Sequence, residues 1–168
     1  MLFVIGLIDN TSNKRLEAVR SRTESIGIPV RPLYGHITFA TYLGNDDTAF
    51  IASCKNMLRN YKPYTIHFEK IDRLPNTSIL AAFPIKEKEL AAIHKCIVEK
   101  WKDTLTIWTQ EEIWQPHTTL LNDAEADLNA VLQVMQDAFT PFDAEIARIE
   151  FSRVQENGFE IVDAVDLV

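Results

Sequence analysis

The stretch "GHITFA", residues 35–40, places a histidine two residues before a threonine inside a short apolar run. The same pattern returns far downstream as "PHTTLL", residues 116–121. Side chains at positions i and i+2 of a strand point to the same face, so each histidine should project beside its threonine. The duplicated pattern therefore predicts two matching half-sites, one in each half of the chain, that face one another.

The rest of the sequence alternates between strand-like and helical patterns. We expect strands over 2–8, 33–42, 113–121, 143–154 and 158–166, and two more in the runs "YTIHFEKI" and "TSILAAFPI". We expect helices over 86–102 and 124–139, one with Phe50, Cys54, Met57, Leu58 and Tyr61 on one side, and one that Thr11 or Ser12 caps and Gly27 ends. Asn157-Gly158 is a strong hairpin signal between the last two strands.

This order of elements predicts an α+β fold. We expect a single bilobal domain over residues 1–168, in which each lobe has an antiparallel sheet backed by helices and a central cleft separates the lobes. The period of the pattern alone leaves other α/β arrangements open.

Composition narrows the class of function. The formal net charge of −7 argues against broad, non-specific binding to nucleic acid, which depends on many contacts between basic side chains and phosphates. No apolar stretch is long enough to span a membrane. The two cysteines, Cys54 and Cys96, fall within helical patterns and fit a cytoplasmic protein with reduced thiols. The oligomeric state is not indicated.

Two facing half-sites of this kind suit phosphodiester chemistry. His36 and His117 could act as general base and general acid, because either protonation state of a histidine is accessible near neutral pH. The hydroxyls of Thr38 and Thr119 could donate hydrogen bonds to the non-bridging oxygens of a phosphate. No metal or other cofactor is required for this chemistry.

Further residues on the same strand edges are candidates to contact a substrate. Strand alternation places Tyr34 and Tyr42 with the first motif and Gln115 with the second. His67 alternates with apolar neighbours and is expected to face solvent, and His94 shares a helix face with apolar residues and is expected to be packed. No residue set has convincing metal-ligand spacing, and neither a phosphate-binding glycine loop nor a G-x-S-x-G elbow occurs.

Together, the segments "HITF" and "HTTL" resemble the paired H-x-[ST]-hydrophobic motifs of the 2H phosphoesterase superfamily, and within it the bacterial 2′-5′ RNA ligase-like proteins. The proline of "QPHTTL" and the segment "LPNTSILAAFPIKEKELAAIHKCI" are also similar to that family. The resemblance implies a bilobal fold with pseudo-two-fold symmetry, His36 and His117 as the acid–base pair, and phosphate bound by Thr38 and Thr119. Many relatives have a basic residue where this chain has Gln115, which bears on substrate preference.

The leading hypothesis is a metal-independent phosphodiesterase. It would act on 2′,3′-cyclic or 2′-5′ phosphodiesters of nucleotides or RNA ends, as do members of the family that the sequence resembles. The alternative is a binding module that keeps the cleft for a nucleotide or RNA end but has lost useful turnover. In the third reading the histidines are purely structural. Release of monophosphate from a cyclic nucleotide separates the first two.

Overall fold

The computed structural model describes residues 1–30, 32–155 and 158–168 of the chain. Its strands are β1 (Leu2–Ile8), β2 (His36–Tyr42), β3 (Tyr64–Arg73), β4 (Ile79–Pro84), β5 (Thr118–Asn122), β6 (Phe142–Gln155) and β7 (Gly158–Asp166). Its α-helices are α1 (Asn10–Ser21), α2 (Asp47–Leu58), α3 (Lys88–Trp101) and α4 (Leu128–Ala138), with 3-10 turns at Arg22–Ile26, Lys102–Thr104 and Ile107–Thr109. The α+β class predicted from the sequence is confirmed.

The strands form one antiparallel sheet, where the sequence predicted two. Its order is β2-β1-β6-β3-β4-β5, and β7 pairs with β6. The difference arises from β6, which is 14 residues long and serves both halves. Its residue Ile146 pairs with Ile8 of β1 and also with Tyr64 of β3. One continuous strand therefore joins what the sequence pattern presents as two separate sheets.

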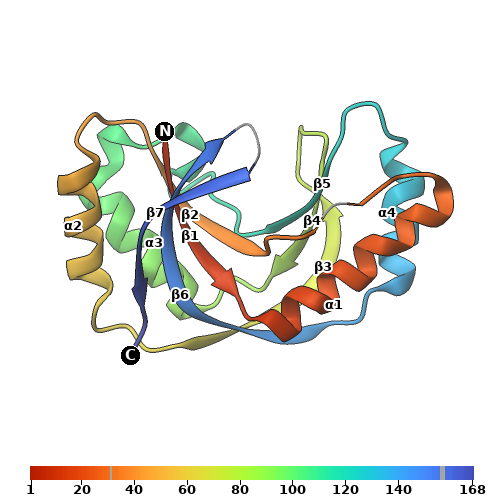
Figure 1. Cartoon of the computed structure of the whole chain (residues 1–168), viewed down its shortest axis with the longest axis horizontal. Coiled ribbons are helices and arrows are strands. Elements are labelled where there is room, and N and C mark those ends of the chain that lie inside the picture. The colour runs from red at the N-terminus through yellow and green to blue at the C-terminus, as the bar shows by residue number, and fades with distance from the viewer. Residues whose placement is uncertain (31, 156–157) are drawn as a thin grey trace.

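The helices gather in two groups that cover different parts of this sheet. Figure 1 shows α2 and α3 together at one end of the molecule and α1 and α4 together at the other, with β2 and β5 between the groups. The first group packs behind β2, and the second behind β3. Each group therefore combines helices from both halves of the sequence: α1, from the start of the chain, packs with α4, and α2 packs with α3.

The ends of the first helical segment differ partly from prediction. Asp9, and not Thr11 or Ser12, caps α1, since its side chain accepts a hydrogen bond from the backbone N–H of Ser12. Gly27 ends the following 3-10 turn with a φ of 83°, as predicted, in the left-handed region that glycine adopts without strain.

Two other sequence predictions concern strand ends. Strand β5 begins at Thr118 and not at residue 113, because Pro116 has no N–H to donate to a neighbouring strand. The predicted hairpin signal at Asn157 lies outside the described residues, although β6 and β7 do pair, with Gln155 opposite Gly158.

The buried apolar side chains form one continuous cluster that includes residues from both groups of helices. Within the described part of the chain, no helix combines the length and the apolar character that crossing a membrane requires. Cys54 is buried, Cys96 is half-buried, and both are free thiols.

Candidate active site

Both motif histidines are held in the same way. His36 Nδ1 lies 2.6 Å from the carbonyl oxygen of Tyr34, and His117 Nδ1 lies 2.8 Å from the carbonyl oxygen of Gln115. A carbonyl oxygen can only accept, so Nδ1 carries the proton in each ring. Nε2 is therefore the nitrogen that gains and loses a proton in both histidines. In each half-site the partner is the carbonyl two residues earlier, so the two local geometries correspond.

A β-bulge follows the threonine of the first motif. Val4 pairs with Ala40 but Ile5 pairs with Thr38, so Phe39 is an extra residue in β2. A bulge changes the phase of the alternation, and side chains beyond it point to the opposite face. His36 and Thr38, which precede the bulge, are half-buried on the face opposite the core, whereas Phe39 is fully buried.

Tyr42 lies beyond this bulge and faces the core. Its side chain is 3% exposed, and its ring stacks on Phe50 of α2 with centroids 4.1 Å apart. The edge of Trp101 from α3 covers another side of the ring. The sequence prediction that Tyr42 contacts substrate is therefore wrong, because uninterrupted alternation was assumed and the bulge breaks it.

The second motif carries a bulge at the matching position. Ala81 of β4 pairs with Thr119, but Leu80 pairs with Leu121, so Leu120 is the extra residue. Leu120 is buried, and Thr119 is half-buried. In both motifs the hydrophobic residue directly after the threonine is therefore the bulged one, which gives the H-x-[ST]-hydrophobic pattern a common backbone geometry.

The structure brings the two motifs together. Thr118 Oγ1 donates a hydrogen bond to the carbonyl oxygen of His36 at 3.1 Å, and Trp114 Nε1 donates one to the carbonyl oxygen of Thr38 at 2.9 Å. These bonds join β5 and the segment before it to β2, although the two strands lie at opposite ends of the sheet order. Figure 1 shows β2 and β5 meeting in the middle of the molecule.

The electrostatics of the two imidazoles are related. Burial lowers the pKa of His36 below the usual value for histidine, and the charge of His117 lowers it further. The Tyr34 carbonyl and the negative charge of Glu150 act in the opposite direction on the pKa of His36. Burial also lowers the pKa of His117, and the Gln115 carbonyl opposes that effect. Both rings are therefore mainly neutral at neutral pH in the free protein.

The two threonine hydroxyls are available to a ligand. Thr38 and Thr119 are both half-buried. Among the hydrogen bonds between described residues, none engages either Oγ1. Each hydroxyl can therefore donate to an oxygen placed between the half-sites.

An aromatic wall borders the first half-site. The ring of Tyr34, 39% exposed, stacks on Phe159 of β7 with centroids 5.7 Å apart and an interplanar angle of 29°. Phe159 also meets the ring of His36 edge-on at 5.7 Å. Of the side chains expected to contact substrate, Tyr34 therefore lies next to a motif histidine, and Gln115 is exposed next to the other.

The second half-site has basic side chains nearby. The ring of Phe83 lies 6.0 Å from that of His117, and Lys70 Nζ lies 5.8 Å from the centroid of Phe83. Lys86 Nζ lies 5.3 Å from the ring of Trp114. Lys70 is also paired with Asp72 at 2.8 Å, so that pair adds little net charge, whereas Lys86 places positive charge beside Trp114.

The remaining histidines lie outside the paired motifs. His94 is 1% exposed, stacks on Trp114 with centroids 3.8 Å apart, and bonds the carbonyl oxygen of Thr109 through Nε2 at 3.0 Å, so its predicted packed role is confirmed. His67 is 38% exposed and lies 2.7 Å from a carboxylate oxygen of Asp143. In the described residues, no group of three or more His, Cys, Asp or Glu side chains is arranged to hold a metal ion.

The sequence analysis did not identify several residues that support the site, namely Trp114, Thr118, Glu150 and Phe159. The sequence contains a signal for Glu150, because a charged residue between Ile149 and Phe151 interrupts an apolar run. It contains no signal for Phe159, because the approach of this ring to His36 depends on how β7 pairs with β6.

Comparisons with known proteins show the fold and the family to which the chain belongs. Solved structures with the same fold include E. coli LigT in complex with NADP+, with a TM-score of 0.69, 12% identity and coverage of 99% of this chain and 96% of that chain. A protein of Thermus thermophilus matches with a TM-score of 0.63, 14% identity, and coverage of 99% and 97%. No curated protein sequence matches significantly. The family model of the 2′-5′ RNA ligase superfamily matches residues 9–158, and the chain therefore belongs to that superfamily.

Proposed function

We propose that this protein is a metal-independent phosphodiesterase that opens 2′,3′-cyclic or 2′-5′ phosphodiesters of nucleotides or RNA ends. Membership in the 2′-5′ RNA ligase superfamily supports phosphodiesterase or ligase-like activity. The observation that carries the proposal is the matching pair of imidazoles. His36 and His117 each have Nδ1 bonded to a carbonyl, and each therefore has Nε2 available for proton transfer.

The proposed reaction needs one neutral and one protonated histidine. The neutral imidazole takes a proton from water through Nε2 while the water oxygen attacks phosphorus. The bond from phosphorus to a ribose oxygen breaks, and the imidazolium delivers its proton to that oxygen. Charge on the phosphoryl oxygens is stabilised by hydrogen bonds from Thr38 and Thr119, so that proton transfer and electrostatic stabilisation act together.

Nucleotides are the proposed ligands. Solved structures of E. coli LigT, which shares the fold, contain 3′-AMP, ATP and NADP+. In this protein the exposed ring of Tyr34 and its partner Phe159 offer an apolar surface beside His36 on which a base could lie. A cytoplasmic location fits the two free thiols of Cys54 and Cys96.

The proposal is tested by incubating the purified protein with 2′,3′-cyclic AMP and a 2′-5′-linked dinucleotide in the presence of EDTA. Release of a monophosphate or cleavage of the linkage, abolished in His36→Ala and in His117→Ala but kept in His67→Ala, supports it. Saturable binding of the same compounds without turnover would favour the binding module instead. Gln115, which is exposed and neutral at the second half-site, is the feature consistent with that alternative.

A further inference from the structure

A buried carboxylate lies on the same face of the sheet as the first motif. Glu150 of β6 is 3% exposed. Ile5 of β1 pairs with Thr38 on one side and with Glu150 on the other, so these three residues form one row across the sheet. Residues that pair directly across antiparallel strands share a face. Glu150 is therefore separated from Thr38 by a single strand and is oriented toward the same side.

Both oxygens of this carboxylate are engaged. The hydroxyl of Tyr34 donates a hydrogen bond to Oε2 of Glu150, and Arg148 Nε donates one to Oε1 at 2.9 Å. Arg148 also donates from Nη1 to Asp166 at 2.8 Å. A buried charge is stable only when it is paired and hydrogen-bonded, and these two donors meet that condition.

Tyr34 connects this carboxylate to His36 through two different groups. Its hydroxyl is held by Glu150, and its carbonyl oxygen accepts the hydrogen bond from His36 Nδ1 at 2.6 Å. Tyr34 lies in the segment before β2, outside any strand. Its carbonyl belongs to the same peptide unit as the N–H of Gly35, which donates a hydrogen bond to Asn13 Oδ1 at 2.9 Å. The side-chain anchor therefore acts together with Asn13 on the carbonyl that orients the imidazole.

The other half-site has no equivalent anchor in the described part of the chain. Gln115 orients His117 through its carbonyl oxygen, but its side chain is exposed and makes no hydrogen bond to a described residue. The two half-sites thus share their backbone geometry and differ in what supports it.

We propose that Glu150 is a positioning residue for His36, which anchors Tyr34 and through it holds the imidazole in its productive orientation. As far as turnover is concerned, this inference rests on the proposed function. The charged and titratable groups around His36 are Tyr34 before β2, His117 before β5, and Glu150, Arg148 and Asp166 on β6 and β7. Because Arg148 is paired with Asp166 as well, Glu150 keeps a net effect on His36, and its negative charge favours the imidazolium form.

Two substitutions separate the anchor from the charge. Tyr34→Phe removes the hydroxyl but leaves the carboxylate. Since the Gly35 N–H still bonds Asn13, kcat should fall about tenfold, less than the roughly 100-fold that a 1 Å misplacement of a catalytic group can cost, while the pKa of His36 does not fall. Glu150→Gln keeps an acceptor for Tyr34 but removes the charge, so the pKa of His36 should fall and the change in kcat should be smaller. Glu150→Leu should produce both effects. KM should change little in all three variants.

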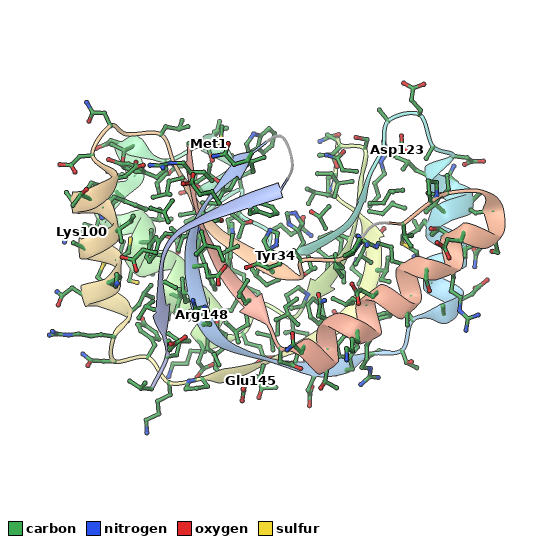
Figure 2. The ribbon with its side chains drawn as sticks, in the orientation of Figure 1. Met1, Tyr34, Lys100, Asp123, Glu145 and Arg148 are labelled. Carbon is green, nitrogen blue, oxygen red and sulfur yellow. The ribbon has the colours of Figure 1, made fainter. Side chains whose placement is uncertain are left out.

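The matched control is Glu145→Gln, which removes a carboxylate from the same strand. Figure 2 shows Glu145 at the lower edge of the molecule, away from Tyr34. Glu145 is exposed, so this variant should alter neither kcat nor the pKa of His36.

The pKa of each histidine is measured by NMR titration of the ring Cε1–H resonances in protein without substrate, after circular dichroism has confirmed folding. A lower His36 pKa in Glu150→Gln, with His117 unchanged, supports the effect of the Glu150 charge even if no tested compound is turned over, and an unchanged His36 pKa would overturn that effect. Wild-type kcat in a folded Tyr34→Phe variant of an active enzyme would overturn the anchoring role. If Glu150→Leu does not fold, the other two variants still decide.

Discussion

The side chain of Thr118 donates a hydrogen bond to the main-chain carbonyl oxygen of His36 across a distance of 3.1 Å. Thr118 is the middle residue of the second motif, and it is 1% exposed. Thr118, which stands between His117 and Thr119, therefore fixes the backbone of His36 in the other motif. This hydrogen bond links the two half-sites directly, and the link does not depend on the strands that lie between them in the sheet.

Thr118→Val removes the hydroxyl that links the two half-sites and keeps the shape of the side chain. The carbonyl of His36 then loses its donor in a buried place, which should lower the free energy of unfolding by about 1–3 kcal/mol. Turnover should fall as well, because the backbone of His36 is less well fixed. Urea denaturation and kcat measure the two effects. Thr118→Ser keeps the hydroxyl and is the control, and wild-type stability in Thr118→Val would contradict the role of this bond.

Loss of either motif imidazole should reduce kcat by about 10²–10⁴-fold, the usual contribution of a general acid or base. The variants are His36→Ala and His117→Ala, assayed on the best cyclic nucleotide or 2′-5′-linked substrate. His67→Ala is the control, because His67 is partly exposed and pairs with Asp143 away from the motifs. A folded but inactive His67→Ala protein would place the chemistry elsewhere.

The threonine hydroxyls should matter less than the imidazoles. Thr38→Ala and Thr119→Ala each remove one donor to a charged oxygen, worth about 1.5–3 kcal/mol, and kcat/KM should fall roughly 10–100-fold in each variant. Thr38→Ser and Thr119→Ser keep the donor and should retain most of the rate. Serine variants as impaired as the alanine variants would show that the methyl group, and not the hydroxyl, is important.

The pH profile should be bell-shaped with its maximum below the usual pKa of histidine. Burial lowers the pKa of both His36 and His117, so in the free protein both rings are neutral at pH 7 and the singly protonated form accumulates as the pH falls. We therefore expect kcat/KM to rise from pH 8 to below pH 6.5 and to fall again when both rings are protonated. The profile should be the same with and without EDTA. Activity that EDTA removes and Mn²⁺ restores would contradict the two-histidine mechanism.

His94 should make the protein less stable in mild acid. Burial lowers its pKa from 6.5 to about 4, so between these values the unfolded chain binds a proton that the folded protein does not. The free energy of unfolding should then decrease as the pH falls through this interval, by an amount on the order of 3 kcal/mol for this residue. His94→Gln should show a weaker pH dependence between pH 6.5 and 4 in urea denaturation. An equal dependence in both proteins would show that His94 does not titrate in this way.

The sequence predicted the helices and strands of the fold better than their assembly. Period-2 and period-3.6 patterns are local, and they located β1, β4 and α3 to within a few residues of their observed bounds. The pairing of one strand with two partners is not local, so β6 could not be recognised as the strand that makes a single sheet.

Side-chain direction was predictable only up to the bulges. His36 and Thr38 do share a face because they precede Phe39, but strict alternation gave the wrong face for Tyr42, which follows it. No residue type in "HITFATY" marks an extra residue in one strand, since a bulge is defined by its partner strand. The connection from Glu150 through Tyr34 to His36 was equally hidden, because Glu150 and His36 are 114 positions apart in the sequence.

The position of β6 in the chain has a consequence for biosynthesis. Both histidines are translated before Phe142–Gln155, the strand that pairs with β1 on one side and β3 on the other. A nascent chain that ends before residue 142 holds both motifs but lacks the strand that joins their halves. Assembly of the site must therefore wait until β6 has left the ribosome, as expected for a fold dominated by non-local pairing. Until then, the edges of β1 and β3 that β6 later covers are open to pairing with other chains.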